Sequence, residues 1–585
     1  MKELKYLNKY LFKYKKNLLF GLFITVISRI FSLVAPRLIG NSLSAVEQFI
    51  KNNSESNIEI LQRTLLINIS IIIGTALISG FFTFLMRQAI INVSRYIEFD
   101  LKNEIFVQYQ ALSQSFYKKN RTGDLMNRIS GDVEKVRMYF GPAIMYSINT
   151  IALFLIVISY MLSVAPKLTA FTLIPLPILS FLIYKLNREI HFRSTIVQEM
   201  LSKLSSFTQE IFTGISVVKS YNLSSSTLSS FNDLSNITKN KNMNLVTLQA
   251  WFFPLMLLLI GASNLIVILV GGSQYINGEI EIGILAEFII YVNMLTWPVT
   301  VVGWLTSVVQ QAEASQKRIN AFLKENPDIK GGNEDIKIES GEIEFRNVSL
   351  IYPETNIKAL NDISFKIKSG ETIGVLGPVG AGKTSLLELI NRLYDPDRGE
   401  IFIDGKNIKL FNLKELRKSI GYVPQNSFLF SESISNNIKF GKNNASQQEI
   451  ENAAKNASIN AEIEKLKNQY NTILGERGIT LSGGQVQRIS IARALIKDPN
   501  IILLDDCLSA VDTDTEEIIL KNLYKFCRLK TTLIISHRIS SIKSANNIIV
   551  LKNGSVIENG THEQLLKNEN YYKKLYLKQQ SEHNK

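Results

Sequence analysis

Six apolar stretches, each long enough to cross a membrane as a helix, lie in the first half of this 585-residue chain. A helix needs about 20 residues to cross roughly 30 Å of hydrocarbon. Helices are favoured there because they pair their own backbone N–H and C=O groups, which find no water in the membrane. The predicted spans lie near residues 17–37, 64–86, 141–164, 166–186, 250–271 and 283–305. Residues 1–16 mix lysines with tyrosine, leucine and phenylalanine, which predicts an amphipathic helix at the membrane interface.

Basic residues are concentrated in two long loops between these stretches, 87–140 and 187–249, whereas loop 272–282 carries only acidic charges. Lysine and arginine favour the cytoplasmic side, so both termini and both long loops are predicted to be cytoplasmic. The long loops show helical periodicity and are predicted to extend the membrane helices, turning near residues 120–124 and 214–216. Such tips could carry force to another domain; the alternative is a solvated helical hairpin.

Charge and cysteine content narrow the class of protein further. A net charge of +14 would suit nucleic acid, but many basic residues flank apolar spans, so a cytoplasmic excess explains it. Cys507 and Cys527 are too few for a disulfide framework and favour a reducing cytosol. Arg29 lies inside the first predicted span, where it could line a cavity, bind an anionic head group or form a structural pair.

The second half of the chain contains a phosphate-binding motif. Residues 377–384 read GPVGAGKT, between a predicted strand at 371–376 and a predicted helix at 385–394. In this context backbone N–H groups and the helix dipole point at phosphates, the lysine bridges the β- and γ-phosphates, and the threonine hydroxyl coordinates Mg²⁺. The predicted binding residues are Gly377, Gly380, Ala381, Gly382, Lys383, Thr384 and Ser385.

Further motifs appear in a fixed order. The apolar run 501–504 ends at Asp505, whose carboxylate can hold the same Mg²⁺, and residues 481–485 read LSGGQ. Taken alone, Tyr352 could stack on adenine or simply pack, and His537, on a turn after a strand, could contact a γ-phosphate or be structural. For Gln425, in the sequence VPQ, a functional role likewise does not follow from the residue alone.

The succession GPVGAGKT, VPQ, LSGGQ, LLDD, SAVD and SHR resembles the ATP-binding cassette of ABC transporters. The preceding spans with two long cytoplasmic loops resemble the membrane domain of type IV ABC exporters, in particular half-transporters such as bacterial lipid flippases and multidrug exporters. The resemblance implies an α-helical six-span transmembrane domain plus an α/β P-loop ATP-binding cassette domain. We expect domains at 17–310 and 341–580, after the interfacial helix 1–16 and joined by a linker at 311–340.

The resemblance also implies residue roles in a dimer. Two cassettes close head to tail over two ATP molecules, so that Ser482 and Gly484, with Gly483 and Gln485, meet the nucleotide held by the partner. Tyr352 would stack on adenine, Gln425 would join the Mg²⁺ ligands and coupling, and His537 would act as a γ-phosphate switch. Residues 475–478 resemble a loop that contacts the intracellular helices, and residues 509–512 a segment that links the two sites.

One position departs from the family pattern. The residue after the metal-binding aspartate is usually glutamate, the base that orients the attacking water, and here it is Asp506. A side chain shorter by one methylene withdraws its carboxylate by roughly 1.5 Å, and misplacement by about 1 Å can slow a reaction on the order of 100-fold. The chain is therefore either a homodimer with a slower base or the impaired half of a heterodimer.

The expected function is ATP-hydrolysing export of lipids, drugs or other amphipathic compounds across the bacterial inner membrane by alternating access. An alternative is a regulatory or channel-like ABC protein in which ATP only gates. A soluble ABC ATPase of translation or DNA repair conflicts with the six predicted spans. An importer conflicts with the joining of membrane and ATPase parts in one chain.

Overall fold

The computed structural model describes residues 3–52, 58–332, 334, 336–475, 481–508, 513–568 and 570–583. The chain forms two compact units, which we call the membrane unit and the nucleotide unit. The membrane unit comprises Met1–Tyr109 and Gly123–Lys324, and the nucleotide unit comprises Gln110–Thr122 and Glu325–Lys585. A short piece of the first long loop thus belongs to the nucleotide unit.

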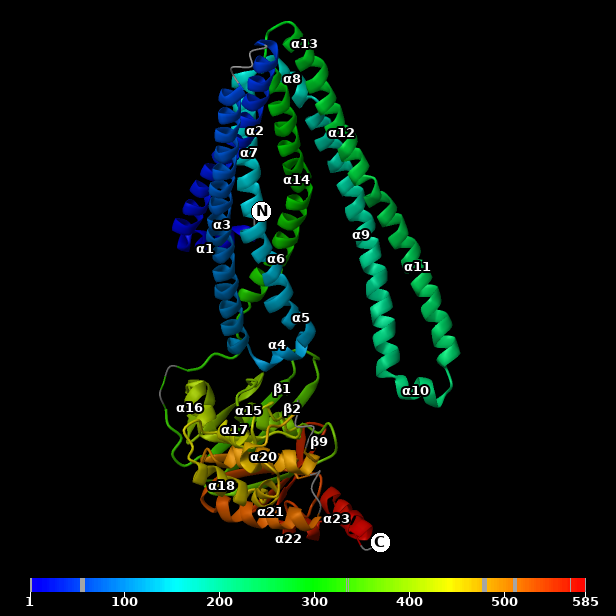
Figure 1. Cartoon of the computed structure of the whole chain (residues 1–585). Helices are drawn as coiled ribbons and strands as arrows, with labels where there is room; N and C mark the ends of the chain where they lie inside the picture. The colour runs from blue at the N-terminus through cyan, green and yellow to red at the C-terminus, as the bar shows by residue number, and fades with distance from the viewer. Residues whose placement is uncertain are drawn as a thin grey trace. The chain divides into compact units, whose positions relative to one another are not determined.

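The described residues of the membrane unit form helices joined by short turns (Figure 1). It begins with a 3₁₀ turn, η1 (Glu3–Leu7), and its later helices are interrupted by short π-helical turns at Arg128–Asp132, Tyr139–Ala143 and Val267–Gly271. The α-helices are α1 (Asn8–Lys13), α2 (Lys15–Asn52), α3 (Ile58–Ala111), α5 (Thr122–Asn127), α6 (Val133–Met138), α7 (Ile144–Val164), α8 (Pro166–Leu173), α9 (Pro175–Thr213), α10 (Ile215–Ser220), α11 (Ser224–Ala250), α12 (Phe252–Ile266), α13 (Gly272–Ile276) and α14 (Ile282–Leu323). Helices α7 and α14 pack through a buried apolar cluster that includes Val157, Phe288 and Leu295.

Five stretches of helix in the described residues are long and apolar enough to cross a membrane: Lys15–Lys51, Ile58–Ala111, Thr122–Val164, Ser224–Ile276 and Ile282–Leu323. The span predicted at 166–186 is not among them. Its apolar run is divided between α8 and α9, because Pro175 has no N–H and restricts the residue before it. Helix α9 then continues into the polar loop, so a six-span count stays a prediction.

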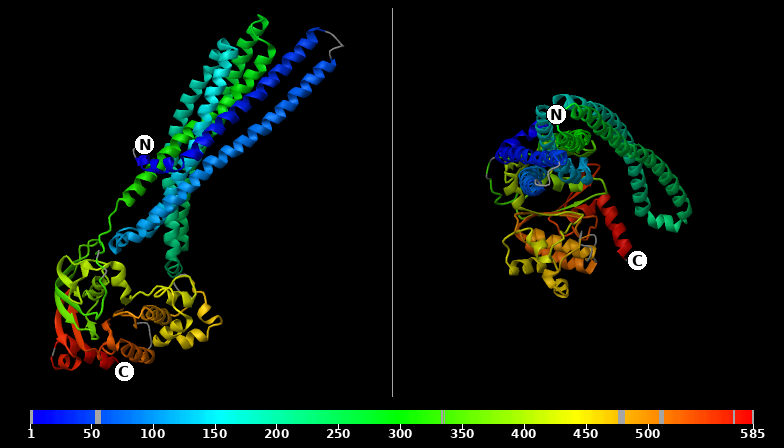
Figure 2. Two further views of the ribbon diagram at one scale, coloured as in Figure 1. Left: turned by 90° about the vertical axis from the view of Figure 1, so that its left-hand side faces the viewer. Right: turned by 45° about the horizontal axis from the view of Figure 1, so that its top comes forward.

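The two long loops do continue as helices and turn near the predicted positions. The first turns around α4 (Gln114–Lys119), which is followed by a break at Asn120 and Arg121. In the second, α9 and α11 run side by side and are joined by α10 (Figures 1 and 2). Both interpretations of this loop, a force-carrying tip and a solvated hairpin, share this helical geometry, so the role of its tip stays a prediction.

The nucleotide unit contains two sheets (Figure 1). A four-stranded sheet has the order β2-β1-β4-β5, and its β1–β2, β1–β4 and β4–β5 pairs are antiparallel. The six-stranded sheet has the order β10-β9-β3-β8-β7-β6 and is parallel except for the β9–β10 pair. The strands are β1 (Ile343–Ile351), β2 (Lys358–Ile367), β3 (Thr372–Leu376), β4 (Arg398–Ile403), β5 (Lys406–Asn407), β6 (Ile420–Val423), β7 (Ile501–Asp505), β8 (Thr531–Ile535), β9 (Asn547–Lys552) and β10 (Ser555–Gly560).

Apolar burial explains this arrangement. Every residue of β3, β7 and β8 is buried, as expected for central parallel strands covered on both faces. Besides α4, the helices are α15 (Lys383–Ile390), α16 (Leu413–Lys418), α17 (Ile434–Lys439), α18 (Gln447–Asn456), α19 (Asn460–Glu464), α20 (Gly483–Leu495), α21 (Thr513–Phe526), α22 (His562–Lys567) and α23 (Tyr571–His583), with 3₁₀ turns at Ile408–Leu410, Gln469–Asn471 and Cys527–Leu529. The unit is therefore an α/β domain, as predicted.

Candidate nucleotide-binding site

The parallel strands bring four sequence-predicted segments to one edge of the six-stranded sheet. Neighbouring strands β3, β8, β7 and β6 run in the same direction, so their carboxyl ends lie together. The phosphate loop follows β3, His537 lies after β8, Asp506 follows β7 and Gln425 lies just after β6. Ligands of open α/β sheets bind outside this edge.

Glycines shape the phosphate loop for two reasons: Gly377 and Gly382 have no room for a side chain, and Gly380 and Gly382 have a left-handed backbone conformation. At Gly382, φ is 93° and a Cβ atom would lie 2.4 Å from the Ala359 carbonyl oxygen. At Gly377, a Cβ atom would lie 2.3 Å from the Leu551 carbonyl oxygen. Gly380 also has a left-handed φ of 79°. These positions explain why a strand can turn directly into α15 here.

Lys383 is the first residue of α15 and is buried. Its Nζ donates to the carbonyl oxygens of Gly377 at 2.8 Å and Pro378 at 3.0 Å, so the side chain folds over the loop. Burial lowers the pKa of Lys383, while the charges of Asp506 and Asp505 oppose that shift. The cation lies within the loop that is predicted to wrap phosphates.

Thr384 and Asp505 form a pair of oxygen donors. The Thr384 hydroxyl donates to Asp505 Oδ1 at 3.2 Å. Burial raises the pKa of Asp505 to about 6, and the Asp506 charge adds to the rise, while the Thr384 hydrogen bond lowers it. A buried carboxylate whose ionised form is disfavoured would be stabilised by a divalent cation, and hydroxyl and carboxylate oxygens are ligands that Mg²⁺ prefers. The two residues therefore fit a Mg²⁺ site.

Asp506 and His537 meet beside this pair. The Asp506 N–H donates to the Ile535 carbonyl at 2.9 Å, and its Oδ1 lies 3.5 Å from the His537 backbone nitrogen, which donates to it. Burial first, and then the Lys383 charge, lower the pKa of His537, while Asp506 opposes them. The imidazole is therefore mostly neutral near pH 7 and can donate or accept one hydrogen bond.

Gln425 lies just after β6, the last strand in the order of the six-stranded sheet. Its side chain is exposed and makes no hydrogen bond to any residue that the structure describes. Its predicted part in holding Mg²⁺ stays a prediction.

Tyr352 is anchored to α15 through its hydroxyl group. The phenol oxygen lies 2.7 Å from Ser385 Oγ and donates to Glu388 Oε2 at 2.6 Å. Burial, followed by the hydrogen bond to Glu388, raises the pKa of Tyr352. The Tyr394 ring packs edge-on against it, with centroids 5.1 Å apart. The ring that is predicted to stack on adenine is therefore fixed beside the phosphate loop, and the Ser385 hydroxyl contributes to holding it.

Sequence reasoning missed Glu388 and Tyr394 as neighbours of this ring. Glu388 lies one helical turn beyond Ser385, so the i, i+3 spacing on α15 could have identified it. For Tyr394 no local signal exists, because its contact with Tyr352 is made only in the folded unit.

Ser482 and Gln485 are engaged with each other rather than with the phosphate loop. The Ser482 Oγ accepts from the Gln485 N–H at 3.3 Å, and Gln485 Oε1 accepts from the Ser482 N–H at 2.9 Å, a capping box at the start of α20. Gln485 also donates to Glu462, which accepts from Arg488 at 2.5 Å. Gly483 and Gly484 form the first turn of the same helix.

Two further predicted segments lie largely outside the described residues. Of the predicted contact loop 475–478 the structure describes only Gly475, and it describes none of residues 509–512.

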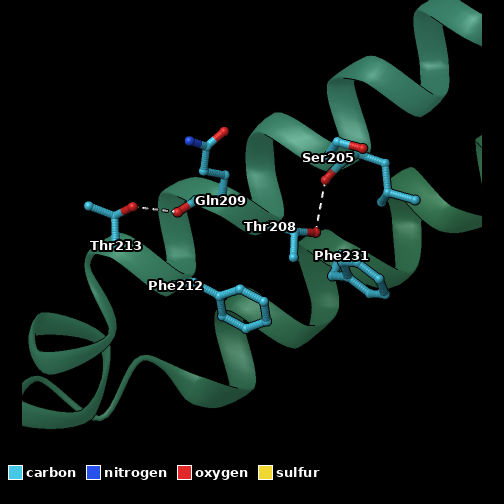
Figure 3. A pocket seen from close by; sticks show the side chains of 7 residues that line it. Ser205, Thr208, Gln209, Phe212, Thr213 and Phe231 are labelled. Carbon is cyan, nitrogen blue, oxygen red and sulfur yellow. Dashed lines mark hydrogen bonds between the residues drawn. The ribbon is translucent and has the colours of Figure 1, made fainter. Parts of the chain in front are cut away.

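A groove of the membrane unit lies between α9 and α11 (Figure 3). The residues that line it are Leu204, Ser205, Thr208, Gln209, Phe212, Thr213 and Phe231. The Thr208 and Thr213 hydroxyls donate to carbonyl oxygens of their own helix, at 2.9 and 2.8 Å. This groove contains none of the predicted nucleotide ligands.

A helical membrane unit and a phosphate-binding α/β unit in one chain define a membrane transport ATPase. Residues 18–299 match the family model of the ABC transporter transmembrane region, and residues 360–509 match the ABC transporter model. The chain belongs to the ABC transporter family. It is a multi-pass protein of the inner membrane, and its ATP-binding domain couples ATP hydrolysis to export.

Individual relatives agree with this assignment. The chain is 37% identical to the multidrug resistance-like ATP-binding protein MdlA of Buchnera aphidicola subsp. Schizaphis graminum, covering 98% of both chains. It is 33% identical to MdlA of Escherichia coli, covering 95% of this chain and 93% of the relative. The fold matches the structure of a bacterial Atm1-family ABC exporter with ATP bound, with a TM-score of 0.79 at 23% identity over 96% of this chain and 99% of that one.

Proposed function

We propose that the chain exports hydrophobic or amphipathic compounds, such as drugs or lipids, by alternating access as a dimer. The observation that carries this proposal is the sheet edge that the phosphate loop shares with Asp505, Asp506 and His537. The same chain has, among its described residues, five apolar helical stretches of membrane-spanning length. Relatives that are described as multidrug resistance proteins support drugs as one cargo class.

The residues of the edge have distinct proposed roles. The loop from Gly377 to Ser385 holds the ATP phosphates, and Tyr352 stacks on adenine. Thr384 and Asp505, with Gln425, hold Mg²⁺, which when bound neutralises charge on the phosphates. Asp506 orients the attacking water, and His537 holds the γ-phosphate through its neutral imidazole.

A second chain completes each site in this proposal. Ser482 and Gln485 bond to each other, and Gln485 also donates to Glu462. These partners are not residues of the phosphate loop, which lies far away in the sequence. The segment Ser482 to Gln485 would therefore serve the nucleotide of the partner. We favour a homodimer, since Asp506 is the only departure from the family motifs; a heterodimer in which this chain has the impaired site is the alternative.

Steady-state Mg²⁺-ATPase activity of the chain, purified alone in lipid nanodiscs, tests the proposal. The wild type is compared with Asp506→Asn, which keeps the shape of the side chain but removes its charge, and with Asp506→Glu. We expect clear turnover that amphipathic compounds stimulate and that falls about 100-fold or more in Asp506→Asn.

Two results would point elsewhere. Near-zero turnover of the wild type that Asp506→Glu restores would indicate the impaired half of a heterodimer. Turnover that no transported compound alters would favour an ATP-gated regulatory protein over an exporter.

A further inference from the structure

One short helix of the first long loop belongs to the nucleotide unit. The unit includes Gln110–Thr122, and α4 occupies Gln114–Lys119 within it. At the start of this segment, the hydroxyls of Ser113 and Ser115 both donate to the Asp328 carboxylate, the first at 2.8 Å. The segment is covalently continuous at both ends with helices of the membrane unit.

Lys118, on α4, meets two carboxylates and two aromatic rings of the cassette. Its Nζ lies 3.6 Å from Glu354 Oε1 and 3.5 Å from Glu388 Oε1. The same ammonium lies over the Tyr352 ring, 4.7 Å from its centroid, and 5.0 Å from the centroid of Tyr394. Both contacts are within the range of cation–π attraction.

These four partners are also bonded to one another. Tyr352 donates to Glu388 at 2.6 Å, Tyr394 donates to Glu354 at 2.8 Å, and the two rings are packed edge to face. Lys118 therefore closes a cluster whose other members hold the Tyr352 ring against α15.

Electrostatics make Lys118 the central member of this cluster. The side chains of Glu354 and Glu388 are only 8% and 11% exposed. Among the residues that the structure describes, Lys118 is the only cation within 4.0 Å of either carboxylate. Removal of its charge would leave two largely buried carboxylates with the tyrosine hydroxyls as donors but without the cation that balances their charge, which is unfavourable.

We propose that Lys118 is a positioning residue for base recognition, which holds the Tyr352 ring for adenine and makes adenine binding depend on the docking of α4. The proposal rests on the proposed role of Tyr352 in stacking on adenine. A ring that is already fixed loses less freedom when a base stacks on it, so its anchors contribute to affinity without touching the nucleotide.

The coupling must act in both directions. If docking of α4 favours adenine binding, then adenine binding favours docking of α4 by the same factor. Binding of the adenine base would thus stabilise the docked position of α4, and the chain continues directly from this segment into α3 and α5.

Two ligands separate base recognition from phosphate binding: ATP and inorganic tripolyphosphate, which has the phosphates but no base. Their dissociation constants are measured without Mg²⁺ by isothermal titration calorimetry on the full chain in nanodiscs. The variants are Lys118→Met, which keeps the length of the side chain, Lys118→Arg, which keeps its charge, and Tyr352→Leu. Lys239→Met, an exposed lysine of α11 in the membrane unit, is the matched control.

We expect Lys118→Met to weaken ATP binding about 3- to 10-fold, the range of one lost cation–π or partly exposed ion-pair contact. Tripolyphosphate binding should be unchanged. Lys118→Arg should restore most of the ATP affinity, and Lys239→Met should resemble the wild type. The unchanged tripolyphosphate affinity would also show that the variant is folded.

Unchanged ATP affinity in Lys118→Met, or an equal loss for both ligands, would overturn the proposal. If Tyr352→Leu alters ATP affinity but Lys118→Met does not, only this inference fails. If Tyr352→Leu leaves ATP affinity unaltered, the stacking role of Tyr352 fails and the inference falls with it.

Amide hydrogen exchange provides the reciprocal test. ATP should slow exchange in residues 113–119 of the wild type, whereas tripolyphosphate should not. The effect of ATP should be lost in Lys118→Met when both proteins are saturated. Equal protection by the two ligands would contradict a coupling that passes through the base.

Discussion

Asp506 is expected to slow ATP hydrolysis, but the local backbone conformation favours an aspartate. Its φ is 42°, in the left-handed region. Aspartate and asparagine occupy this region more readily than other residues with a Cβ atom, because their short polar side chains can bond locally. The departure from the family glutamate is therefore compatible with the local backbone, whatever its effect on hydrolysis.

We expect the two substitutions of Asp506 to differ in their effect on stability. Asp506→Asn should leave the unfolding temperature of the full chain nearly unchanged. Asp506→Glu should destabilise the nucleotide unit by about 1 kcal/mol, because the longer side chain is less favourable at positive φ. Differential scanning calorimetry measures both variants beside the wild type, and equal unfolding temperatures for all three would refute the backbone argument.

If Asp505 is a Mg²⁺ ligand, as proposed, its pKa predicts that metal affinity depends on pH. Its pKa is raised to about 6, so the carboxylate is mostly ionised above pH 6 and increasingly protonated below it. Because Mg²⁺ competes with that proton, the affinity for the metal in the presence of ATP should fall up to about tenfold per unit below pH 6. Mn²⁺ as a spectroscopic substitute measures this by electron paramagnetic resonance.

The same raised pKa of Asp505 affects folding in the opposite sense: a rise in pH strengthens metal binding but weakens the contribution of this group to stability. A pKa raised above the unfolded value means that the folded protein binds more protons between about pH 4 and 6, so this group favours folding less as pH rises through that window.

In the measurement of metal affinity, the Asp505→Asn variant controls for titration of ATP itself. If it retains the full pH dependence of metal binding, Asp505 is not the titrating ligand.

At the scale of elements, the sequence predicts the succession of β3, phosphate loop and α15. The structure shows why this succession needs a glycine at position 382. Gly382 is the N-cap residue just before α15, has a left-handed conformation and lies against the backbone of Ala359 on β2. Its identity is therefore determined both by its own φ and by a second element that the motif does not include.

A comparison of two glycines separates these causes. Gly405 has a φ of 74° and open space where a Cβ atom would lie, whereas Gly382 faces a carbonyl oxygen at 2.4 Å. Gly405→Ala should destabilise the protein by about 1 kcal/mol, the cost of the backbone conformation alone. Gly382→Ala should destabilise it by about 2–4 kcal/mol, since the clash with a backbone atom is added. Calorimetric unfolding of both variants measures the difference, and equal losses would mean that the loop relaxes around the methyl group.

At the scale of the whole molecule, shared sites predict complementation between two inactive chains. Lys383→Ala removes the phosphate-loop lysine. Gly483→Glu places a charge in the LSGGQ segment, residues 481–485, which we call the signature; Gly483 is exposed. Each variant alone should have almost no ATPase activity. A mixed dimer regains one complete site, built from the intact loop of one chain and the intact signature of the other.

For random pairing, co-expressed variants should recover about a quarter of wild-type activity, because about half of the dimers are mixed and each has one of two sites. Activity of the purified mixture, with its mass measured by light scattering, tests this. Absence of recovery together with a monomeric mass would contradict the dimer.

The sequence alone determined the two-part organisation and most of the nucleotide edge. Length and continuity of the apolar runs predict membrane helices, and glycine, lysine and acid at fixed spacing predict the phosphate loop and Asp505, because these signals are local. Parallel strands then gather the segments after their carboxyl ends at one edge, which brings His537 and Asp506 together as the motifs suggest.

Only the tertiary structure decided how α4 relates to the cassette and where the apolar run at 166–186 is broken. Lys118 is more than 230 residues from Tyr352, Glu354, Glu388 and Tyr394 in the sequence, and no periodicity connects it to them. Its role arises from packing of segments that are distant in the chain, whereas a motif records only what neighbouring residues require. The sequence thus predicts the groups that bind a nucleotide, and the fold shows which residue of the first long loop meets Tyr352 and Glu388.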